Sequence, residues 1–370
     1  MRIATFNVEN LFERAKALNG ATWAEGREAL EDHARINRLL NKARYSAADK
    51  RRIVELLTKL GLDKSDDGHS FARLRQNRGK LLKRPRTGPL EIVAGGRDDW
   101  IGWVELKTEP VSELATRHTA MVIQQVDADV LGVVEAEDRV ALKRFSEQLL
   151  ASLGSSPYAH VMVIDGNDDR GIDVGLMTKA GFDIVGIRSH VDDDDGQGQV
   201  FSRDCPEFVV TTASGERLVV LVNHFKSKGF GPASASNRLR KRQATRVKEI
   251  YKRLRADGER HVVVMGDFND TPGSPPLAPL LEQTDLKDIT AHSSFVGDGR
   301  PGTFANGTKS NKIDYVLLSP ELFANVTHGR FFRDGVWGGV HGTLFPHFPT
   351  ITRAIDAASD HAAVVADVDL

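Results

Sequence analysis

Short runs of apolar residues recur through most of this chain, and their pattern predicts a protein rich in β-strands. Near-continuous runs such as Val262-Val263-Val264-Met265 are typical of strands buried on both faces. Strands are expected at residues 2–8, 130–134, 159–164, 173–177, 184–189, 208–212, 218–223, 261–265, 315–318 and 362–369. Helical spacing predicts helices at 112–126, 140–150 and 236–255. Because strands outnumber helices and several are joined by short turns, we expect two mixed sheets packed face to face, with helices outside.

A second pattern occupies residues 14–115, where apolar residues recur at helical spacing and predict a mostly helical segment. Residues 64–88 are polar and basic with little periodicity, which is typical of a mobile stretch. Residues 90–93 and 100–106 flank a glycine- and aspartate-rich turn at 95–99, which predicts a β-hairpin. Length alone would suggest two domains, but large α/β sandwiches also form single domains.

Composition places the chain among ordinary globular proteins, with 40% hydrophobic and 27% charged residues. No apolar stretch has the length of a membrane-spanning helix, and the first residues enter a strand without the apolar region of a signal peptide. The single cysteine, Cys205, excludes an internal disulfide and a cysteine-based metal site. We expect a cytoplasmic monomer that does not bind membranes.

The net charge of −1 conceals two basic segments. Residues 35–86 contain 16 Lys and Arg against 5 Asp and Glu, and residues 226–255 contain 11 against one. Most of the remaining chain is acidic, including the run at 192–195. This segregation favours a polyanionic partner. The alternative is that the basic residues form the solvated faces of two helices.

The sharpest polar motif follows the apolar run that ends at Met265. Gly266 permits a tight backbone geometry, and Asp267 and Asn269 point to the same side of an extended backbone. A carboxylate can orient or deprotonate a water molecule, and a neighbouring amide can hold that water or a phosphate oxygen. The same residues also suit an ordinary turn closed by Pro272, so the motif alone leaves both interpretations open.

Further acidic and amide groups lie at strand ends. Glu135 ends the strand at 130–134, and Asn7 and Glu9 lie on one side of the first strand. A polar pair that interrupts an apolar strand is costly unless it is used. Open α/β sheets place ligands at strand ends, and carboxylate and amide oxygens suit Mg²⁺ or Mn²⁺. The pattern therefore predicts a divalent-metal site, with Glu135 as a ligand.

Two strand boundaries carry histidines. Asp360 and His361 precede the last strand, where Asp360 is a candidate metal ligand and His361 would face a phosphate. Asp314 begins another strand, and a buried carboxylate there needs a partner. His361 would serve, which would fix the tautomer of the imidazole and raise its pKa. Alone, each motif is more often a turn or a strand start at the surface.

His224 follows the strand at 218–223 and is a candidate to contact a phosphate oxygen or to protonate a leaving group, although a lone histidine there is more often structural. Asn223 precedes it, and Lys226 and Lys228 begin the second basic segment. We therefore include these three residues as candidates for binding a phosphate or the substrate.

The motif order Asn-x-Glu, Glu, Asn-His, Gly-Asp-x-Asn, Ile-Asp-Tyr and Ser-Asp-His resembles the endonuclease/exonuclease/phosphatase superfamily, which has the DNase I-like fold. The resemblance covers about residues 1–13 and 116–370 and is closest to bacterial members. It implies a four-layered α/β sandwich with its active site at one edge of two packed sheets. Residues 1–370 would then form a single domain, interrupted by a mostly helical basic insertion at about 14–115.

The resemblance also implies roles for the metal-binding residues. Glu135 would be the principal Mg²⁺ (or Mn²⁺) ligand, supported by Asn7, Glu9 and Asp360. His224 matches the histidine of DNase I-like and sphingomyelinase-like members, whereas AP endonucleases carry a tyrosine-based motif at this place.

The remaining roles concern water and phosphate. Asp267 would orient or activate the attacking water, and Asn269 would hold that water or the phosphate. Asp314 and His361 would stabilise the pentacovalent phosphate. Arg170 lies in a stretch that resembles a strand of bacterial members and is a candidate for phosphate binding.

The chain departs from the family in spacing, because Asn7 and Glu135 lie 128 residues apart, whereas the family needs a few tens. A basic insertion at this point would clamp nucleic acid or cover the cleft as a lid. Trp100 and Trp103 are able to stack on bases, but their place in a hairpin favours packing in a core.

Three functions fit these features. The first is a nuclease that hydrolyses DNA or RNA by metal-assisted, in-line attack of water, with the basic segments on backbone phosphates. The second is a phosphatase or phosphodiesterase that acts on inositol phosphates, lipid headgroups or nucleotides. The third is an inactive nucleic-acid-binding scaffold, which we rank last because every position of the motif set holds a competent residue.

Overall fold

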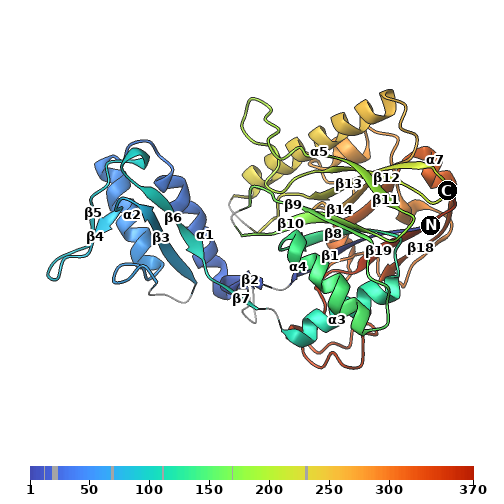
Figure 1. Ribbon diagram of the computed structural model, residues 1–370, viewed down its shortest axis with the longest axis horizontal. Coiled ribbons are helices and arrows are strands. Elements are labelled where there is room, and N and C mark those ends of the chain that lie inside the picture. Colours follow the sequence, from blue (N-terminus) through green and yellow to red (C-terminus); the bar gives the residue numbers. More distant parts are fainter. Residues whose placement is uncertain (12, 19–23, 68–70, 111, 169, 230–231) are drawn as a thin grey trace. The chain divides into compact units, whose positions relative to one another are not determined.

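The structure, a computed structural model, describes the chain apart from residues 12, 19–23, 68–70, 111, 169 and 230–231. The chain forms two compact units, each with its own helices and strands (Figure 1). The main unit consists of Met1–Phe12 and Val111–Leu370, and the inserted unit consists of Glu13–Pro110. Among the described residues, no helix combines the length and the apolar character needed to cross a membrane.

The main unit contains a seven-stranded mixed sheet in the order β16-β18-β19-β1-β8-β10-β9. β1 runs parallel to β8, and β16 runs parallel to β18, while the other neighbours are antiparallel. The strands are β1 (Arg2–Leu11), β8 (Val130–Ala136), β9 (His160–Ile164), β10 (Asp173–Thr178), β16 (Phe295–Val296), β18 (Val326–Phe332) and β19 (Ala363–Val368).

A second sheet has six strands in the order β11-β12-β13-β14-β17-β15. Only β13 and β14 are parallel neighbours in it. The strands are β11 (Asp183–Arg188), β12 (Glu207–Thr211), β13 (Arg217–His224), β14 (Val262–Asp267), β15 (Lys287–Asp288) and β17 (Asp314–Leu318).

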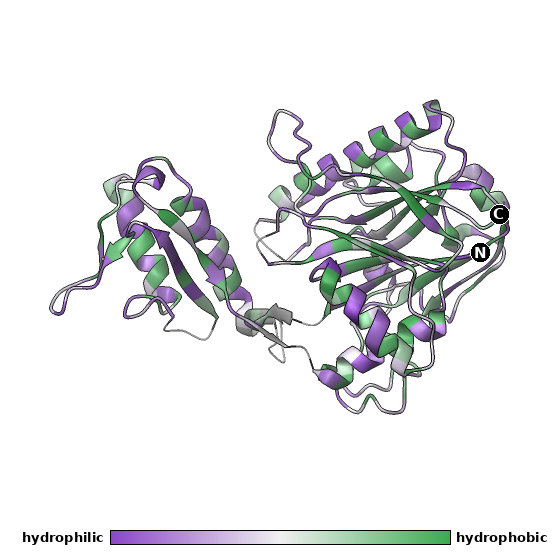
Figure 2. Cartoon of the chain, viewed as in Figure 1, coloured by the Kyte–Doolittle hydropathy of each residue, from purple (hydrophilic) through white to green (hydrophobic). Residues whose placement is uncertain are grey.

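The two sheets pack face to face, and helices cover their outer sides, which makes four layers. Alternate strand residues such as Val134 and Val263 meet in an apolar core between the sheets. The outer face of the seven-stranded sheet packs on α3 (Glu113–Val126), α4 (Arg139–Arg144) and the π-helical turn η3 (Phe145–Leu150). The six-stranded sheet is covered by α5 (Ala233–Ala256) and α6 (Ala278–Leu281), and α7 (Pro320–Ala324) follows β17. Along α5, hydrophobic and hydrophilic residues alternate (Figure 2).

The predicted four-layered sandwich of two mixed sheets is confirmed. Every strand and helix that the pattern predicts in the main unit is present, with ends that shift by at most three residues. The pattern missed β18, because its apolar residues are interrupted by His328 and Arg330, whose side chains are only partly buried.

The inserted unit packs helices against short strands. α1 (Ala24–Leu40) and α2 (Ala47–Lys59) share an apolar core with β3 (Ala72–Arg78) and β6 (Ile101–Leu106). The smaller pair is β4 (Leu82–Lys83) with β5 (Glu91–Ile92), and η1 (Lys16–Leu18) and η2 (Arg97–Asp99) are single 3-10 turns. α2 begins with a capping box, in which Ser46 accepts from the Asp49 N–H and the Asp49 side chain accepts from the Ser46 N–H.

The predicted hairpin between residues 90–93 and 100–106 is wrong. β6 pairs with β3, and β5 pairs with β4, so each strand finds its partner in the polar stretch at 64–88. That stretch therefore contains strands, and the insertion is less helical than its apolar spacing predicts. The sequence pattern did not predict β3, because only Ala72 and Leu74 of this strand are apolar residues that face the core, and arginines alternate with them.

The chain enters and leaves the inserted unit through one short antiparallel ladder. β2 (Glu13–Ala15) pairs with β7 (Thr108–Pro110), and the register places Arg14 opposite Glu109. We call this ladder the stem. Because paired strands lie about 5 Å apart, the two ends of the inserted unit are neighbours.

Candidate active site

The motif at the end of β14 places a carboxylate and an amide side by side. Gly266 has a φ of +128°, and a Cβ there would lie 2.0 Å from the Asn223 carbonyl oxygen, so this position requires glycine. The buried Asp267 carboxylate accepts from the Asn269 backbone N–H at 2.7 Å and from the Asn269 Nδ2 at 3.1 Å. The two side chains therefore act as one polar group at the strand end.

β17 brings a second carboxylate next to the first, because Asp314 is the direct cross-strand partner of Asp267. The oxygens of Asp314 lie 2.9 and 3.1 Å from the Nδ1 of His361, which precedes β19. Burial disfavours the imidazolium, but the carboxylates of Asp314 and Asp360 outweigh it and raise the pKa of His361 well above its usual value. Burial and the charge of Asp314 also raise the pKa of Asp267 to about 7.

β1 contributes the two polar residues that interrupt its apolar pattern. The Asn7 Nδ2 lies 3.4 Å from both the Glu135 Oε1 and the Asp267 Oδ2, so its amide bridges carboxylates from the two sheets. The Asn7 Oδ1 accepts from the Glu9 N–H at 3.0 Å. A role for Asn7 as an oxygen ligand would require its amide to be turned over. The Glu9 carboxylate accepts from the backbone N–H of Asp360 at 3.1 Å, which links β1 to the start of β19.

Glu135 reaches the cluster through a β-bulge. Val134 is opposite Val174 and Ala136 is opposite Asp173, so the register passes over Glu135 as the extra residue of the bulge. It also has a φ of +65°. A bulged residue with left-handed backbone re-aims its side chain, and here the carboxylate is directed toward Asn7.

Backbone strain is concentrated around this cluster. Among the described residues, the non-glycine residues with positive φ are Glu9, Asp127, Glu135, Asn269 and Ala305. Three of them carry the polar side chains described above, and the Ala305 N–H donates to the Asp360 carbonyl. Such conformations cost about 1–3 kcal/mol each and are typical of functional sites.

His224 ends β13 beside Arg170, which the sequence suggested for phosphate binding, and Arg203, which no sequence pattern had indicated. The buried Arg203 lies 2.6 Å from the His224 Nε2 through its terminal nitrogen and 3.1 Å from the His224 Nδ1 through its Nε. Burial and the charges of Arg203 and Arg170 lower the pKa of His224 well below its usual value. A neutral imidazole is a poor acid, so the predicted contact with a phosphate oxygen suits His224 better than protonation of a leaving group.

Asp168 holds the two arginines together. It forms a bidentate pair with Arg170 at 2.6 and 2.8 Å, and it lies 3.2 Å from Arg203. Arg170 is also close enough to Glu135 for that carboxylate to raise its pKa. Arg203 and Asp168 lie in loops away from any apolar run. Nothing in the local pattern marks them, and only their burial reveals them.

Of the three substrate-binding residues predicted around His224, Asn223 points away from it and Lys228 is paired elsewhere. Asn223 is on the opposite side of β13 from His224, where its Nδ2 donates to the Leu221 carbonyl. Strand alternation makes this unavoidable for adjacent residues. Lys228 forms an ion pair with Asp270 at 2.8 Å. Lys226 is close to the arginines, and burial together with the charges of Arg203 and Arg170 lowers its pKa to about 8.

The sequence profile of the Endonuclease/Exonuclease/phosphatase family matches residues 91–333, which is more than half of the chain. The chain belongs to this family. Its members are phosphoester hydrolases and are generally metal-dependent. No curated protein sequence matches the chain.

Solved structures of the family share its DNase I-like fold with this chain. A mannosyl-6-phosphatase of Bacteroides thetaiotaomicron is 19% identical with a TM-score of 0.50, over 70% of this chain and 92% of that one. The catalytic domain of human nocturnin with a bound sulfate is 15% identical with a TM-score of 0.48, over 70% of this chain and 88% of that one. Identities this low establish the fold alone.

The chemistry of the cluster fits the divalent metal that the family generally uses. The Glu135 carboxylate contacts the Asn7 amide, Glu9 contacts Asn7 through its backbone N–H, and the Glu9 carboxylate accepts from the Asp360 N–H. These linked residues carry three carboxylates, and carboxylate oxygens are the ligands that Mg²⁺ and Mn²⁺ prefer. A separate buried group is formed by Asp267, Asp314 and His361, whose ligand atoms lie within 4.8 Å of one another. A protonated imidazole cannot bind a metal, so the first set is the better candidate.

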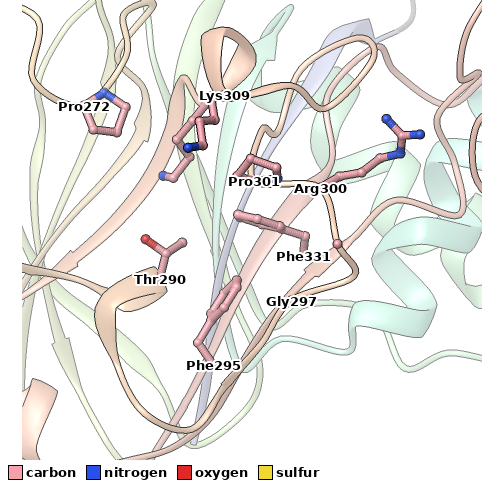
Figure 3. A pocket seen from close by; sticks show the side chains of 10 residues that line it. Pro272, Thr290, Phe295, Gly297, Arg300, Pro301, Lys309 and Phe331 are labelled. Atoms are coloured by element: carbon pink, nitrogen blue, oxygen red, sulfur yellow. The ribbon is translucent and has the colours of Figure 1, made fainter.

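A cavity of about 570 Å³ lies between β16, the end of β18 and the loops that precede β17 (Figure 3). Two lining residues connect it with the polar cluster: Pro272 follows the Asp267 motif in the chain, and Lys312 donates to the Asp314 carbonyl. Phe295 and Phe331 provide an apolar floor, and Lys309 lies across from them. The volume is typical of a site for a small molecule.

Proposed function

We propose that the main unit is a divalent-metal-dependent phosphodiesterase that hydrolyses nucleic acid. The observation that carries this proposal is the convergence of polar groups from β1, β8, β13, β14, β17 and β19 at one edge of the two sheets. Distances among their side chains are 2.9–3.8 Å, and most are buried. Buried carboxylates at this density are costly without a charged ligand.

Glu135 would hold the metal, with Glu9, Asp360 and Asn7 as supporting ligands. When bound, such a cation would polarise a phosphoryl oxygen and stabilise the leaving oxygen. The bulge and the left-handed backbone at Glu135 fix the direction of its carboxylate in advance. Pre-organisation of this kind is what a site for charge stabilisation requires.

Asp267 and Asn269 would position the attacking water. Asp267 accepts from both nitrogens of Asn269, which orients the carboxylate, and its raised pKa makes it a stronger base than a solvated aspartate. His361, kept charged by Asp314, would donate its Nε2 hydrogen to a phosphoryl oxygen. Arg170 and Arg203 add positive charge behind His224, which would bind a further phosphoryl oxygen as a neutral donor.

Nucleic acid is favoured as the substrate by one face of α5. Most of the basic residues of this helix are neutralised, for example Arg242 by Asp195 and Arg246 by Asp193. In the described part of the chain, four others have no ion pair and share one side of the helix by spacing: Arg238, Lys241, Lys248 and Lys252. A row of cations on one helix face suits a run of backbone phosphates.

A small phosphate ester is the second candidate. The cavity in Figure 3 has the volume of a ligand site, and Lys309 has no ion pair among the described residues. The structural similarity to a mannosyl-6-phosphatase is compatible with this alternative. An organic phosphate whose apolar part contacts Phe295 and Phe331 would fill the cavity.

The test is hydrolysis by the purified protein with Mg²⁺ and with Mn²⁺. Plasmid DNA, single-stranded DNA, RNA, inositol phosphates, nucleotides and a sugar phosphate are offered in parallel. We expect nucleic-acid cleavage that is lost in Glu135→Ala and in Asp267→Ala and is retained in Glu147→Ala, which removes a half-exposed carboxylate of η3. Cleavage of only a small ester would favour the second candidate. Tight nucleic-acid binding without turnover would indicate a scaffold.

A further inference from the structure

The two-stranded sheet formed by β3 and β6 in the inserted unit has one face that packs on α1 and α2. Its other face does not pack on these helices. Ala72, Leu74 and Val104 point into the core between α1 and α2. Because strand residues alternate, the other face carries Arg73, Arg75, Ile101, Trp103 and Glu105. We call these five residues the open face.

Trp103 is unusual on this face. Its side chain is 41% exposed, and among the described residues it is the one aromatic in the group of exposed large apolar side chains. Trp100, three residues earlier, is buried and donates its indole N–H to the Tyr45 hydroxyl. The prediction that both tryptophans pack in a core is therefore confirmed for Trp100 and wrong for Trp103. Ile101, also on the open face, is 46% exposed, so the apolar surface is continuous.

Arginines lie directly across the ladder from these apolar residues. Arg75 is opposite Trp103, and Arg78 is opposite Ile101. A single oxygen of Glu105 accepts from the Nε of Arg73 and the Nε of Arg75, both at 2.6 Å. This pairing fixes both guanidinium groups and leaves their terminal nitrogens as donors. One carboxylate cannot neutralise two arginines, so the open face has a net positive charge.

The charge of the whole inserted unit agrees with this local excess. Residues 13–110 contain 21 Lys and Arg against 15 Asp and Glu, a net charge of +6. The complete chain has 50 against 51, so the rest of the chain has 29 against 36, a net charge of −7. The basic character of the protein is thus gathered in the unit that carries the exposed tryptophan.

We propose that the open face binds single-stranded nucleic acid. One base would stack on the indole of Trp103, and neighbouring phosphates would bind Arg73, Arg75 and Arg78. Single strands are favoured because an unpaired base offers a free ring face, whereas a duplex keeps its bases stacked internally. The inference rests on the proposed function in taking nucleic acid as the polymer, but it does not depend on hydrolysis.

The test is fluorescence anisotropy of the full-length protein with fluorescein-labelled oligo(dT) and oligo(U), in EDTA so that no cleavage occurs. We expect Trp103→Ala to weaken binding about tenfold to a hundredfold, and Trp103→Phe to weaken it less, since it keeps an aromatic ring. Arg78→Ala should also reduce the slope of log K against log salt by about 0.7. Ile187→Ala, which removes an exposed apolar side chain of β11, should change nothing.

Unchanged affinity in Trp103→Ala would overturn the inference, as would equal losses for a duplex and a single strand. A circular dichroism spectrum like that of the wild type shows that each variant is folded. Hydrolysis is scored separately. Cleavage with no effect of Trp103→Ala on binding would leave the proposed function intact and remove the open face from it. Trp103-dependent binding without any cleavage would support the open face as a binding site and contradict the proposed hydrolysis.

Discussion

Asp267 and His361 both hold protons more tightly than they would in water, but for different reasons. Burial and the adjacent charge of Asp314 disfavour the carboxylate of Asp267. His361 is buried as well, yet carboxylates around it more than restore its charged form. Asp314 therefore acts on both groups, and its contribution to the site is larger than its own contacts suggest.

Asp314 and His361 should behave as one catalytic unit. We expect Asp314→Asn and His361→Asn each to lower kcat by about 10²–10³-fold, because a charged donor to the phosphoryl oxygen is lost or misplaced. The double variant should be little worse than either single variant, since residues that act together are non-additive. Steady-state kinetics on whichever substrate the hydrolysis test identifies measure this, with Glu147→Gln as the control. Multiplicative losses would show that the two residues act separately.

Gly266 should be intolerant of any side chain. Gly266→Ala combines left-handed backbone with a Cβ 2.0 Å from the Asn223 carbonyl oxygen, so we expect a loss of about 2–5 kcal/mol in the free energy of unfolding. Gly215 is a matched control, since its φ is +86° and its Cβ would meet nothing within 4 Å. Gly215→Ala should cost only about 1–2 kcal/mol. Urea unfolding compares the two, and equal losses would exclude the clash as the cause.

At the scale of elements, α5 shows how charge in a sequence differs from charge on a surface. The acidic run at 192–195 and the basic helix are far apart in the chain, yet ion pairs from Asp193 and Asp195 to the helix neutralise part of it. The buried Glu207 on β12 forms a further ion pair with the partly exposed Arg253, and it lies 2.5 Å from the His190 Nε2. Local composition cannot anticipate such pairs, because they depend on how a loop folds back over a helix.

Glu207 should make the fold sensitive to acid. Burial opposes its ionisation, but His190 and Arg253 outweigh it, so the pKa of Glu207 is lowered. A lowered pKa stabilises the fold above the unfolded value of about 4.3, and this stability is lost as pH falls through the folded value. Glu207→Gln should cost about 1.5–3 kcal/mol at pH 7, because the hydrogen bonds that the charged carboxylate accepts from His190 and Arg253 are weakened. Urea unfolding at several pH values should show the gap to the wild type narrowing below about pH 4, and a constant gap would exclude ionisation as its source.

The unpaired face of α5 should control the salt dependence of nucleic-acid binding. Lys241→Gln and Lys252→Gln should each weaken oligonucleotide binding and lower the salt slope by about 0.7 for a single strand. Arg242→Gln is the internal comparison, because its cation already pairs with Asp195 and should contribute less to the slope. Titrations at several salt concentrations measure the slopes. Equal slopes in all variants would place the polymer elsewhere.

At the scale of the molecule, the sequence predicted most strands of the main unit and few of the inserted one. Strands buried on both faces can be predicted from unbroken apolar runs, and the polar motifs at the ends of these runs indicated Asp267, Asp314 and Glu135. The inserted unit builds its sheet from strands with only one buried face, where arginines interrupt the pattern. In the site, Arg203 and Asp168 were not predicted, because a residue buried in a loop belongs to no periodic pattern of apolar positions.

The two units should be separable. The inserted unit has its own core and the stem brings its ends together, so replacing residues 13–110 by a short Gly/Ser linker should leave the main unit folded. We expect the shortened protein to hydrolyse a small phosphodiester at close to the wild-type rate and to bind oligonucleotides more weakly. Kinetics and anisotropy measure the two effects. A variant that folds but has lost hydrolysis of the small substrate would show that the inserted unit takes part in catalysis.

The stem has a further consequence for the order of folding. Asn7 and Glu135 meet across 128 residues of chain, and bringing such distant segments together carries a large loop-closure entropy. If the inserted unit folds first, its paired ends bridge the gap, and the loop that the main unit must close becomes roughly fourfold shorter. Since each doubling of loop length costs about 0.6 kcal/mol, closure becomes easier by about 1.2 kcal/mol. An inserted unit that has already folded would thus let the central β1–β8 pair form faster than an unfolded one would, while contributing no residue to that pair.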